Sequence, residues 1–222
     1  MADVVEEELR RGEARWLEHW KAGPKRTRWS KLPLQPGDAA PTFSLPDQSG
    51  AAFELSELWR GRPALILFWR HFGCSCGVDR ARRLVEEYAK LVEMASVAII
   101  GQGEPERGKA YAEKYGLPPV RILSDPAGKV YEAFGLLEGK PSQLVYDAPE
   151  AFLDRDVETG VRFCLERRAD GRPPVDNPWL LPGEFVVRKG GEVELAYRYN
   201  YCEDYPDARV LYAAIREATR GA

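Results

Sequence analysis

The sequence predicts an α/β protein, a sandwich of helices around a central sheet whose strands run in mixed directions. Residues 64–69 (ALILFW) form a continuous apolar run of strand length, which is typical of a strand buried on both faces of a sheet. Residues 78–94 follow with apolar side chains at helical spacing. Strand-like and helix-like segments then alternate, and the pattern closes with a hairpin at residues 184–188 and 192–199.

The N-terminal part predicts a separate helix. Residues 3–21 carry an imperfect apolar stripe that includes Trp16 and Trp20, and Gly23-Pro24 ends the helix. Residues 25–35 are basic and contain proline, so we interpret them as an extended connector. We therefore expect residues 1–35 to form an N-terminal helix and connector, and residues 36–222 to form the main domain. The tryptophans pack either on this domain or on a second copy of the chain, so a homodimer is one of the two expectations.

The remaining elements follow from local apolar patterns and from turn residues. The longer connection at residues 136–181 predicts a strand at 143–146 and a helix at 149–168, and it ends in a proline-rich run at 172–182. Elsewhere we expect short strands at 41–45, 53–55, 96–100 and 120–123, and helical segments at 56–59, 105–115, 130–134 and 207–219.

The composition narrows the class of protein. The chain has 222 residues, 44% of them hydrophobic, and 32 basic side chains nearly balance 35 acidic ones. This excludes a disordered tail and argues against a nucleic-acid binder held by a general basic field. The longest apolar stretch is far shorter than the ~20 residues that a membrane-spanning helix needs. We expect a cytoplasmic protein with neither nucleic acid nor membrane as a partner.

Two of the four cysteines indicate redox chemistry. Cys74 and Cys76 lie one residue apart, between the buried strand and the long helix, where sites form in open α/β sheets. A helix N-terminus stabilises a thiolate over a thiol, and the thiolate is the nucleophile in both disulfide exchange and peroxide reduction. A Cys-x-Cys disulfide closes a small, strained ring that is easily reduced. This spacing favours a redox pair over a structural disulfide or two packed cysteines.

Three of the residues near the pair in sequence or after the last strand are candidates for supporting roles, and the fourth cysteine is not. Arg70 precedes the pair and adds positive charge, and His71 either tunes the thiol pKa and relays a proton or lies on the surface. Cys202 follows the last predicted strand and is a resolving thiol, a neighbour in space of the cysteine loop, or a packed cysteine at the end of a loop. Cys164 lies in a predicted helix among apolar residues, where core packing is favoured.

Several motifs in this order resemble peroxiredoxins of the alkyl hydroperoxide reductase/thiol-specific antioxidant (AhpC/TSA) superfamily. They are GDAAPTFSL at 37–45, the apolar strand before the cysteine loop, YAEKYGLP at 111–118, LSDP at 123–126 and PGEFVV at 182–187. The resemblance covers about residue 36 to the end. It implies a thioredoxin-like three-layer sandwich with an N-terminal helical extension, and a thiol redox activity.

The cysteine loop departs from both parent patterns. The peroxiredoxin pattern places Gly77 at the peroxidatic position, and the thioredoxin pattern places Gly73 and Cys76 at its two cysteines. The loop resembles most the peroxiredoxin-like group with Arg-x-x-Gly-Cys, which makes Cys74 the first cysteine. Where peroxiredoxins carry an arginine before the later strand, this chain has Pro182, which resembles the thioredoxin cis-proline. The resemblance therefore supports dithiol–disulfide exchange better than peroxidase activity.

We expect an oxidoreductase that acts on a disulfide or a peroxide, is reduced by an external thiol such as a thioredoxin-type protein, and needs no cofactor. One alternative is a metal or iron–sulfur binding module that uses His71, Cys74, Cys76 and Cys202. A second alternative is a redox-inactive thioredoxin-like interaction domain that binds a partner through its N-terminal helix.

Overall fold

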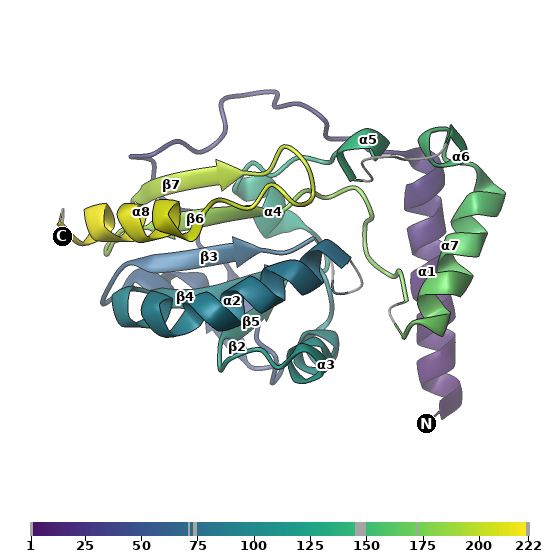
Figure 1. Ribbon diagram of the computed structural model, residues 1–222, viewed down its shortest axis with the longest axis horizontal. Coiled ribbons are helices and arrows are strands. Elements are labelled where there is room, and N and C mark those ends of the chain that lie inside the picture. Colours follow the sequence, from purple (N-terminus) through teal and green to yellow (C-terminus); the bar gives the residue numbers. More distant parts are fainter. Residues whose placement is uncertain (1, 71, 73–74, 145–149, 172, 221–222) are drawn as a thin grey trace.

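Strand β3 (Ala64–Phe68) lies at the centre of a five-stranded sheet in the computed structural model of the chain (Figure 1). The order of strands is β5-β4-β3-β6-β7, in which β3, β4 and β5 run parallel and β6 and β7 run antiparallel to their neighbours. All five side chains of β3 are buried, which explains its unbroken apolar sequence. The structure describes residues 2–70, 72, 75–144, 150–171 and 173–220.

The elements follow one another in the alternation that the sequence predicts. The other strands are β1 (Ser44–Pro46), β2 (Ala52–Glu54), β4 (Ser96–Gly101), β5 (Arg121–Ser124), β6 (Gly183–Val187) and β7 (Val193–Arg198). The helices are α1 (Ala2–Ala22), α2 (Ser75–Met94), α3 (Pro105–Tyr115), α4 (Lys129–Ala133), α5 (Pro141–Leu144), α6 (Glu150–Leu153), α7 (Val157–Ala169) and α8 (Ala208–Arg220), with a 3-10 turn η1 (Leu55–Trp59).

Helices cover both faces of the sheet and make a three-layer sandwich. On one face α2, α3 and α8 pack on the side chains of alternate sheet residues such as Leu65, Ile99 and Val186. On the other face α4, η1 and the β1–β2 pair enclose Ile66 and Phe185. The predicted α/β fold with a central mixed sheet is confirmed. Among the described residues, no helix has the length and apolarity that crossing a membrane demands.

The N-terminal helix packs on its own chain. Helix α1 lies beside α7, away from the sheet (Figure 1). The ring of Trp20 stacks at 5.5 Å from Trp179 and 6.4 Å from Phe163, measured between ring centres. Its indole nitrogen donates to the carbonyl oxygen of Asp156 at 3.1 Å. Of the two expectations for the tryptophans, packing on the main part of the chain is confirmed. The boundary near residue 35 and the homodimer stay predictions.

The predicted strand at 143–146 is wrong. Its first two residues belong to the short helix α5, and residues 145–146 lie outside the described residues. Pro141 suits the first position of a helix, and the side-chain oxygen of Gln143 accepts a hydrogen bond from the backbone nitrogen of Lys140 at 2.8 Å. The run is short and apolar at Leu144, a pattern that does not separate a strand from a helical turn.

The predicted helix at 149–168 is split into α6 and α7. Between them Arg155 adopts a left-handed backbone conformation with φ of 56°, which ends α6. Asp156 then caps α7 by accepting a hydrogen bond from the Thr159 backbone nitrogen at 2.7 Å. Helix α2 begins three residues earlier than predicted, at Ser75, so its first turn includes Cys76.

A buried cluster of polar side chains fastens α2 to the sheet. The Arg80 side chain donates to the Glu184 carboxylate at 2.7 Å, and the Tyr199 hydroxyl donates to the same oxygen at 2.6 Å. Glu87 completes the cluster at 3.2 Å from Arg80. Burial, and then the charge of Glu184, raises the pKa of Tyr199 well above its ordinary value. Because the pair is shielded from water, removing either Arg80 or Glu184 alone would leave a buried charge without a counter-ion and destabilise the fold.

Gly160→Ala is expected to destabilise the α1–α7 packing. A Cβ atom at this position would lie 2.8 Å from Cδ1 of Trp20 and 2.9 Å from Cδ1 of Leu17, so a side chain must shift. The overpacking should lower the free energy of unfolding by about 1–3 kcal/mol in urea denaturation. Gly61→Ala is the control, because nothing lies within 4 Å of its added Cβ. A gain in stability at position 160, as alanine usually gives inside a helix, would contradict this packing.

Arg80→Met is expected to lower the free energy of unfolding by about 3–5 kcal/mol, because it leaves the buried Glu184 carboxylate without its guanidinium partner. The double variant Arg80→Met/Glu184→Met should recover much of this loss, since no buried charge remains. Urea denaturation followed by circular dichroism measures both. A single variant that loses less than about 1 kcal/mol would mean that the pair is solvated, as surface pairs are.

Candidate functional site

The first turn of α2 places Cys76 at the carboxyl end of the central strand β3. Cys76 is 5% exposed and sits among the first backbone N–H groups of the helix, which have no intrahelical acceptor. These groups and the helix dipole favour negative charge on a side chain at this end. Cys74 and His71 lie outside the described residues, so the structure tests neither their geometry nor the pairing of the two cysteines.

Arg70 follows β3 and turns its side chain into the protein. Its Nε donates to the Leu180 carbonyl oxygen at 3.1 Å, and its terminal nitrogen donates to the Pro178 carbonyl oxygen. The arginine thereby joins the start of the thiol loop to the segment that leads into β6. It was predicted as a source of positive charge near the thiols, and the structure adds this bracing role.

Pro182 lies in that same segment, next to β6, and is buried. The expected likeness to a cis-proline is wrong, because the peptide bond between Leu181 and Pro182 is trans. The main chain on both sides is held by hydrogen bonds: the Leu181 nitrogen donates to the Leu137 carbonyl at 2.9 Å, and the Pro182 carbonyl accepts from the Tyr199 nitrogen at 3.2 Å. These two bonds are consistent with an extended trans chain entering β6.

The ring of Phe72, inside the cysteine loop, packs against three glycines, a contact that the sequence analysis missed. A Cβ on Gly101 would lie 2.3 Å from the Phe72 ring, and one on Gly103 would lie 2.6 Å from it. A Cβ on Gly108 in α3 would lie 3.5 Å from Cζ of the Phe72 ring, so Gly108 is the third glycine in this contact. The glycine pair at 101 and 103, directly after a buried strand, was the available signal, because glycine there allows a close approach.

Cys202 lies in the loop after β7, and Cys164 lies in α7. The backbone nitrogen of Cys202 donates to the Gln143 carbonyl at 3.0 Å, and its sulfur lies 3.2 Å from the Leu144 carbonyl oxygen. Cys164 is buried in the cluster that α1 and α7 form, and burial raises the pKa of its thiol to about 11. At neutral pH that thiol stays protonated and unreactive, as expected for a packing cysteine.

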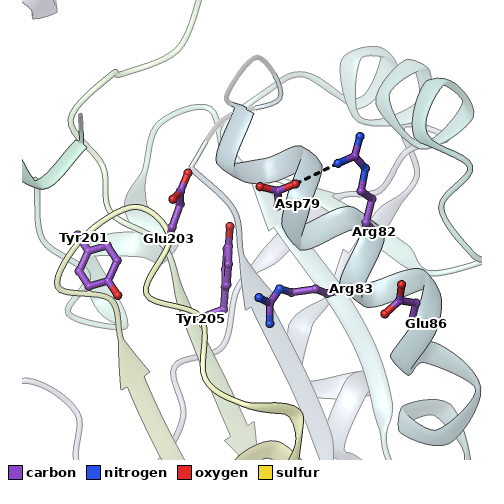
Figure 2. Close-up of a pocket in the computed structure, with 7 residues that line it drawn as sticks. All are labelled: Asp79, Arg82, Arg83, Glu86, Tyr201, Glu203 and Tyr205. Atoms are coloured by element: carbon purple, nitrogen blue, oxygen red, sulfur yellow. Dashed lines mark hydrogen bonds and ion pairs between the residues drawn. The ribbon is translucent and has the colours of Figure 1, made fainter. Parts of the chain in front are cut away.

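A pocket of about 430 Å³ opens between the first turns of α2 and the loop after β7. Figure 2 shows its seven lining residues, which are Asp79, Arg82, Arg83 and Glu86 from α2 and Tyr201, Glu203 and Tyr205 from the loop. Burial, followed by the charges of Glu203 and Cys76, raises the pKa of Tyr205.

The described residues contain no group of three or more His, Cys, Asp or Glu side chains placed to hold a metal ion. The metal alternative includes His71 and Cys74, which those residues do not cover. Metal analysis of the protein, rather than the structure of the described residues, therefore tests this alternative.

Comparison with known proteins identifies relatives and similar folds. The chain is 30% identical to chloroplastic peroxiredoxin Q of Populus jackii over 144 residues, which cover 55% of this chain and 66% of the relative. It is 35% identical to peroxiredoxin Bcp of Escherichia coli over 109 residues, 47% of this chain and 66% of that protein. The matches thus span slightly less than two thirds of the length of these relatives.

Solved structures share the fold at low sequence identity. A peroxiredoxin-like protein from Aquifex aeolicus superposes with a TM-score of 0.59 at 14% identity, covering 85% of this chain and 90% of that one. Peroxidoxin BcpB of Mycobacterium tuberculosis superposes with a TM-score of 0.55 at 16% identity, covering 83% and 97%. The AhpC/TSA family matches residues 36–195, so the chain belongs to the AhpC/TSA family, which has the thioredoxin fold.

Proposed function

We propose that the chain is a thiol-dependent oxidoreductase in which Cys74 and Cys76 alternate between a dithiol and a disulfide. The observation that carries the proposal is the position of Cys76, in the first turn of α2 at the carboxyl end of the central strand. This is where an open α/β sheet binds ligands and where a helix stabilises a thiolate. Membership of the AhpC/TSA family supports the same chemistry.

The proposed reaction moves two electrons. One cysteine thiolate attacks a sulfur atom of a disulfide or an oxygen atom of a peroxide. It becomes a mixed disulfide as a thiol leaves, or a sulfenic acid as water or an alcohol leaves. The second cysteine attacks that sulfur, forms the Cys74–Cys76 disulfide and releases the second thiol or water. An external thiol, for example a thioredoxin-type protein, then returns two electrons and two protons.

Disulfide exchange is the favoured branch. The Nε and one terminal nitrogen of Arg70 donate to the carbonyl oxygens of Leu180 and Pro178, so these N–H groups point toward the main chain. The charge of Arg80 is balanced by the buried Glu184 carboxylate. These two cations are thus already engaged by main-chain or carboxylate oxygens, whereas peroxide cleavage benefits from donors aimed at the departing oxygen. Cytoplasmic location, where thiols stay reduced, suits this chemistry and remains part of the proposal.

Counting thiols before and after one equivalent of peroxide tests the dithiol mechanism. The wild-type protein is expected to lose two thiols, whereas Cys74→Ser and Cys76→Ser should each lose at most one, because no disulfide forms between the pair. Cys164→Ser is the matched control, since its buried thiol has a pKa of about 11 and should not react. Cys202→Ser shows whether that cysteine resolves the first intermediate.

Metal analysis of the same samples separates the competing functions. One equivalent of zinc or iron bound to the wild-type protein and lost in Cys76→Ser would replace the dithiol enzyme with a metal-binding module. A third outcome is that the thiols react with neither peroxide nor oxidised dithiothreitol and that no metal is bound. This outcome would support the redox-inactive interaction domain.

A further inference from the structure

Positive charge is concentrated where the chain leaves α1. Residues 21–32, which we call the basic segment, contain five basic side chains and no acidic one. Because the whole chain has a net charge of -3 and this segment +5, the remaining residues carry -8. The five basic residues are Lys21, Lys25, Arg26, Arg28 and Lys31. The segment therefore creates a local positive potential on a protein that is acidic elsewhere.

Four of these five cations have no carboxylate partner. Among the residues that the structure describes, only Arg26 of the five forms an ion pair, at 3.3 Å from Glu132. The other four residues are exposed and have no opposite charge within 4.0 Å in the described part of the chain. Their charge is thus available to a partner outside the protein.

The basic segment is irregular, but it is fastened to the rest of the chain. The carboxylate of Glu138 accepts hydrogen bonds from the backbone nitrogens of Lys25 and Arg26, the second at 3.1 Å. The indole nitrogen of Trp29 donates to the Gly135 carbonyl oxygen at 2.7 Å. Figure 1 shows the chain that leaves α1 running along the outer edge of the molecule. The cations are therefore presented from a fixed backbone, which lowers the entropy lost when a partner binds.

Two apolar side chains lie among the cations. Leu32 is 79% exposed, more than any other large hydrophobic side chain in the described part of the chain, and Trp29 is 47% exposed. A leucine gains free energy when it leaves water, and tryptophan favours the boundary between water and lipid. A nucleic-acid backbone offers phosphates but no apolar surface for Leu32. A bilayer with anionic lipid offers both negative headgroups and acyl chains.

We propose that the basic segment binds the surface of a bilayer that contains anionic lipid. Lys25, Arg28 and Lys31 contact the headgroups, and Trp29 and Leu32 enter the boundary between headgroups and acyl chains. This proposal replaces the expectation that a membrane is no partner, which followed from the lack of a spanning stretch, because a peripheral contact needs none. It is independent of the thiol chemistry, so its failure would leave the proposed function untouched.

Co-sedimentation of the full chain with lipid vesicles tests the proposal. Vesicles of phosphatidylcholine alone should leave the protein in the supernatant, whereas vesicles with about 30% phosphatidylglycerol should carry it into the pellet. Raising the salt concentration from about 0.02 M to about 0.5 M should release the protein, because salt screens exposed charges. A reductant in every sample keeps the cysteines from forming disulfides.

Replacing three cations of the basic segment by glutamine should lower the partition coefficient about 100-fold, since each basic side chain near an anionic surface contributes about fivefold. This variant is Lys25→Gln/Arg28→Gln/Lys31→Gln. The matched control removes the same charge from exposed positions on α3 and α8, and it should lose less than about fivefold. The control variant is Lys109→Gln/Lys114→Gln/Arg216→Gln. Circular dichroism checks that both variants are folded.

Leu32→Ser separates a lipid surface from other anionic partners. It should lower the partition coefficient about tenfold and leave its salt dependence unchanged, because it removes apolar burial but no charge. Val210→Ser, at an apolar position of α8 that is 42% exposed, is the matched control and should bind as the wild type does.

Three results would overturn the proposal. The first is equal binding, or no binding, to neutral and anionic vesicles. The second is a control triple variant that loses as much affinity as the triple variant of the basic segment. The third is unchanged vesicle binding by Leu32→Ser together with tighter binding of a single-stranded oligonucleotide, which would assign the basic segment to nucleic acid instead.

Discussion

The buried guanidinium of Arg70 needs oxygen acceptors, and the segments around the cysteine loop are arranged to supply them. An arginine side chain does not lose its proton in a protein, and a buried charge without acceptors costs several kcal/mol, so oxygen atoms must be held around it. Arg70 is only 8% exposed, and the carbonyl oxygens of Pro178 and Leu180 accept from it. These hydrogen bonds hold residues 178–180, which precede β6, beside the end of β3. They also hold Arg70, the residue from which the cysteine loop begins.

Three separate elements keep that segment in place. Arg107 of α3 forms two hydrogen bonds of 2.6 Å with the carboxylate of Asp176. Gln102, at the end of β4, accepts from the Asn177 backbone nitrogen at 3.1 Å. Trp179 donates its indole hydrogen to the His19 carbonyl oxygen of α1 at 2.6 Å. Through Trp179 the N-terminal helix becomes part of the scaffold of the cysteine loop rather than an appendage to it.

Local sequence patterns predicted the sheet and the position of Cys76 beside the start of α2, because burial on both faces of β3 and helical periodicity in α2 show in residues that are adjacent in sequence. They failed at α5, where four residues carry too little periodicity to tell a strand from a helical turn. They also missed the contact of the Phe72 ring with Gly101 of β4 and Gly108 of α3. Those features depend on residues that meet only after the chain has folded.

The pairing of α1 with later segments has a consequence for the protein during its synthesis. Hydrogen bonds join His19 to Trp179 across 160 residues and Trp20 to Asp156 across 136. At roughly 5–20 residues per second, a ribosome needs about 7–27 s to extend the chain from Trp20 to Asp156, the residue before α7. Throughout that interval Trp16 and Trp20 have no partner surface on α7, so the apolar side of α1 stays unpacked until α7 has been made.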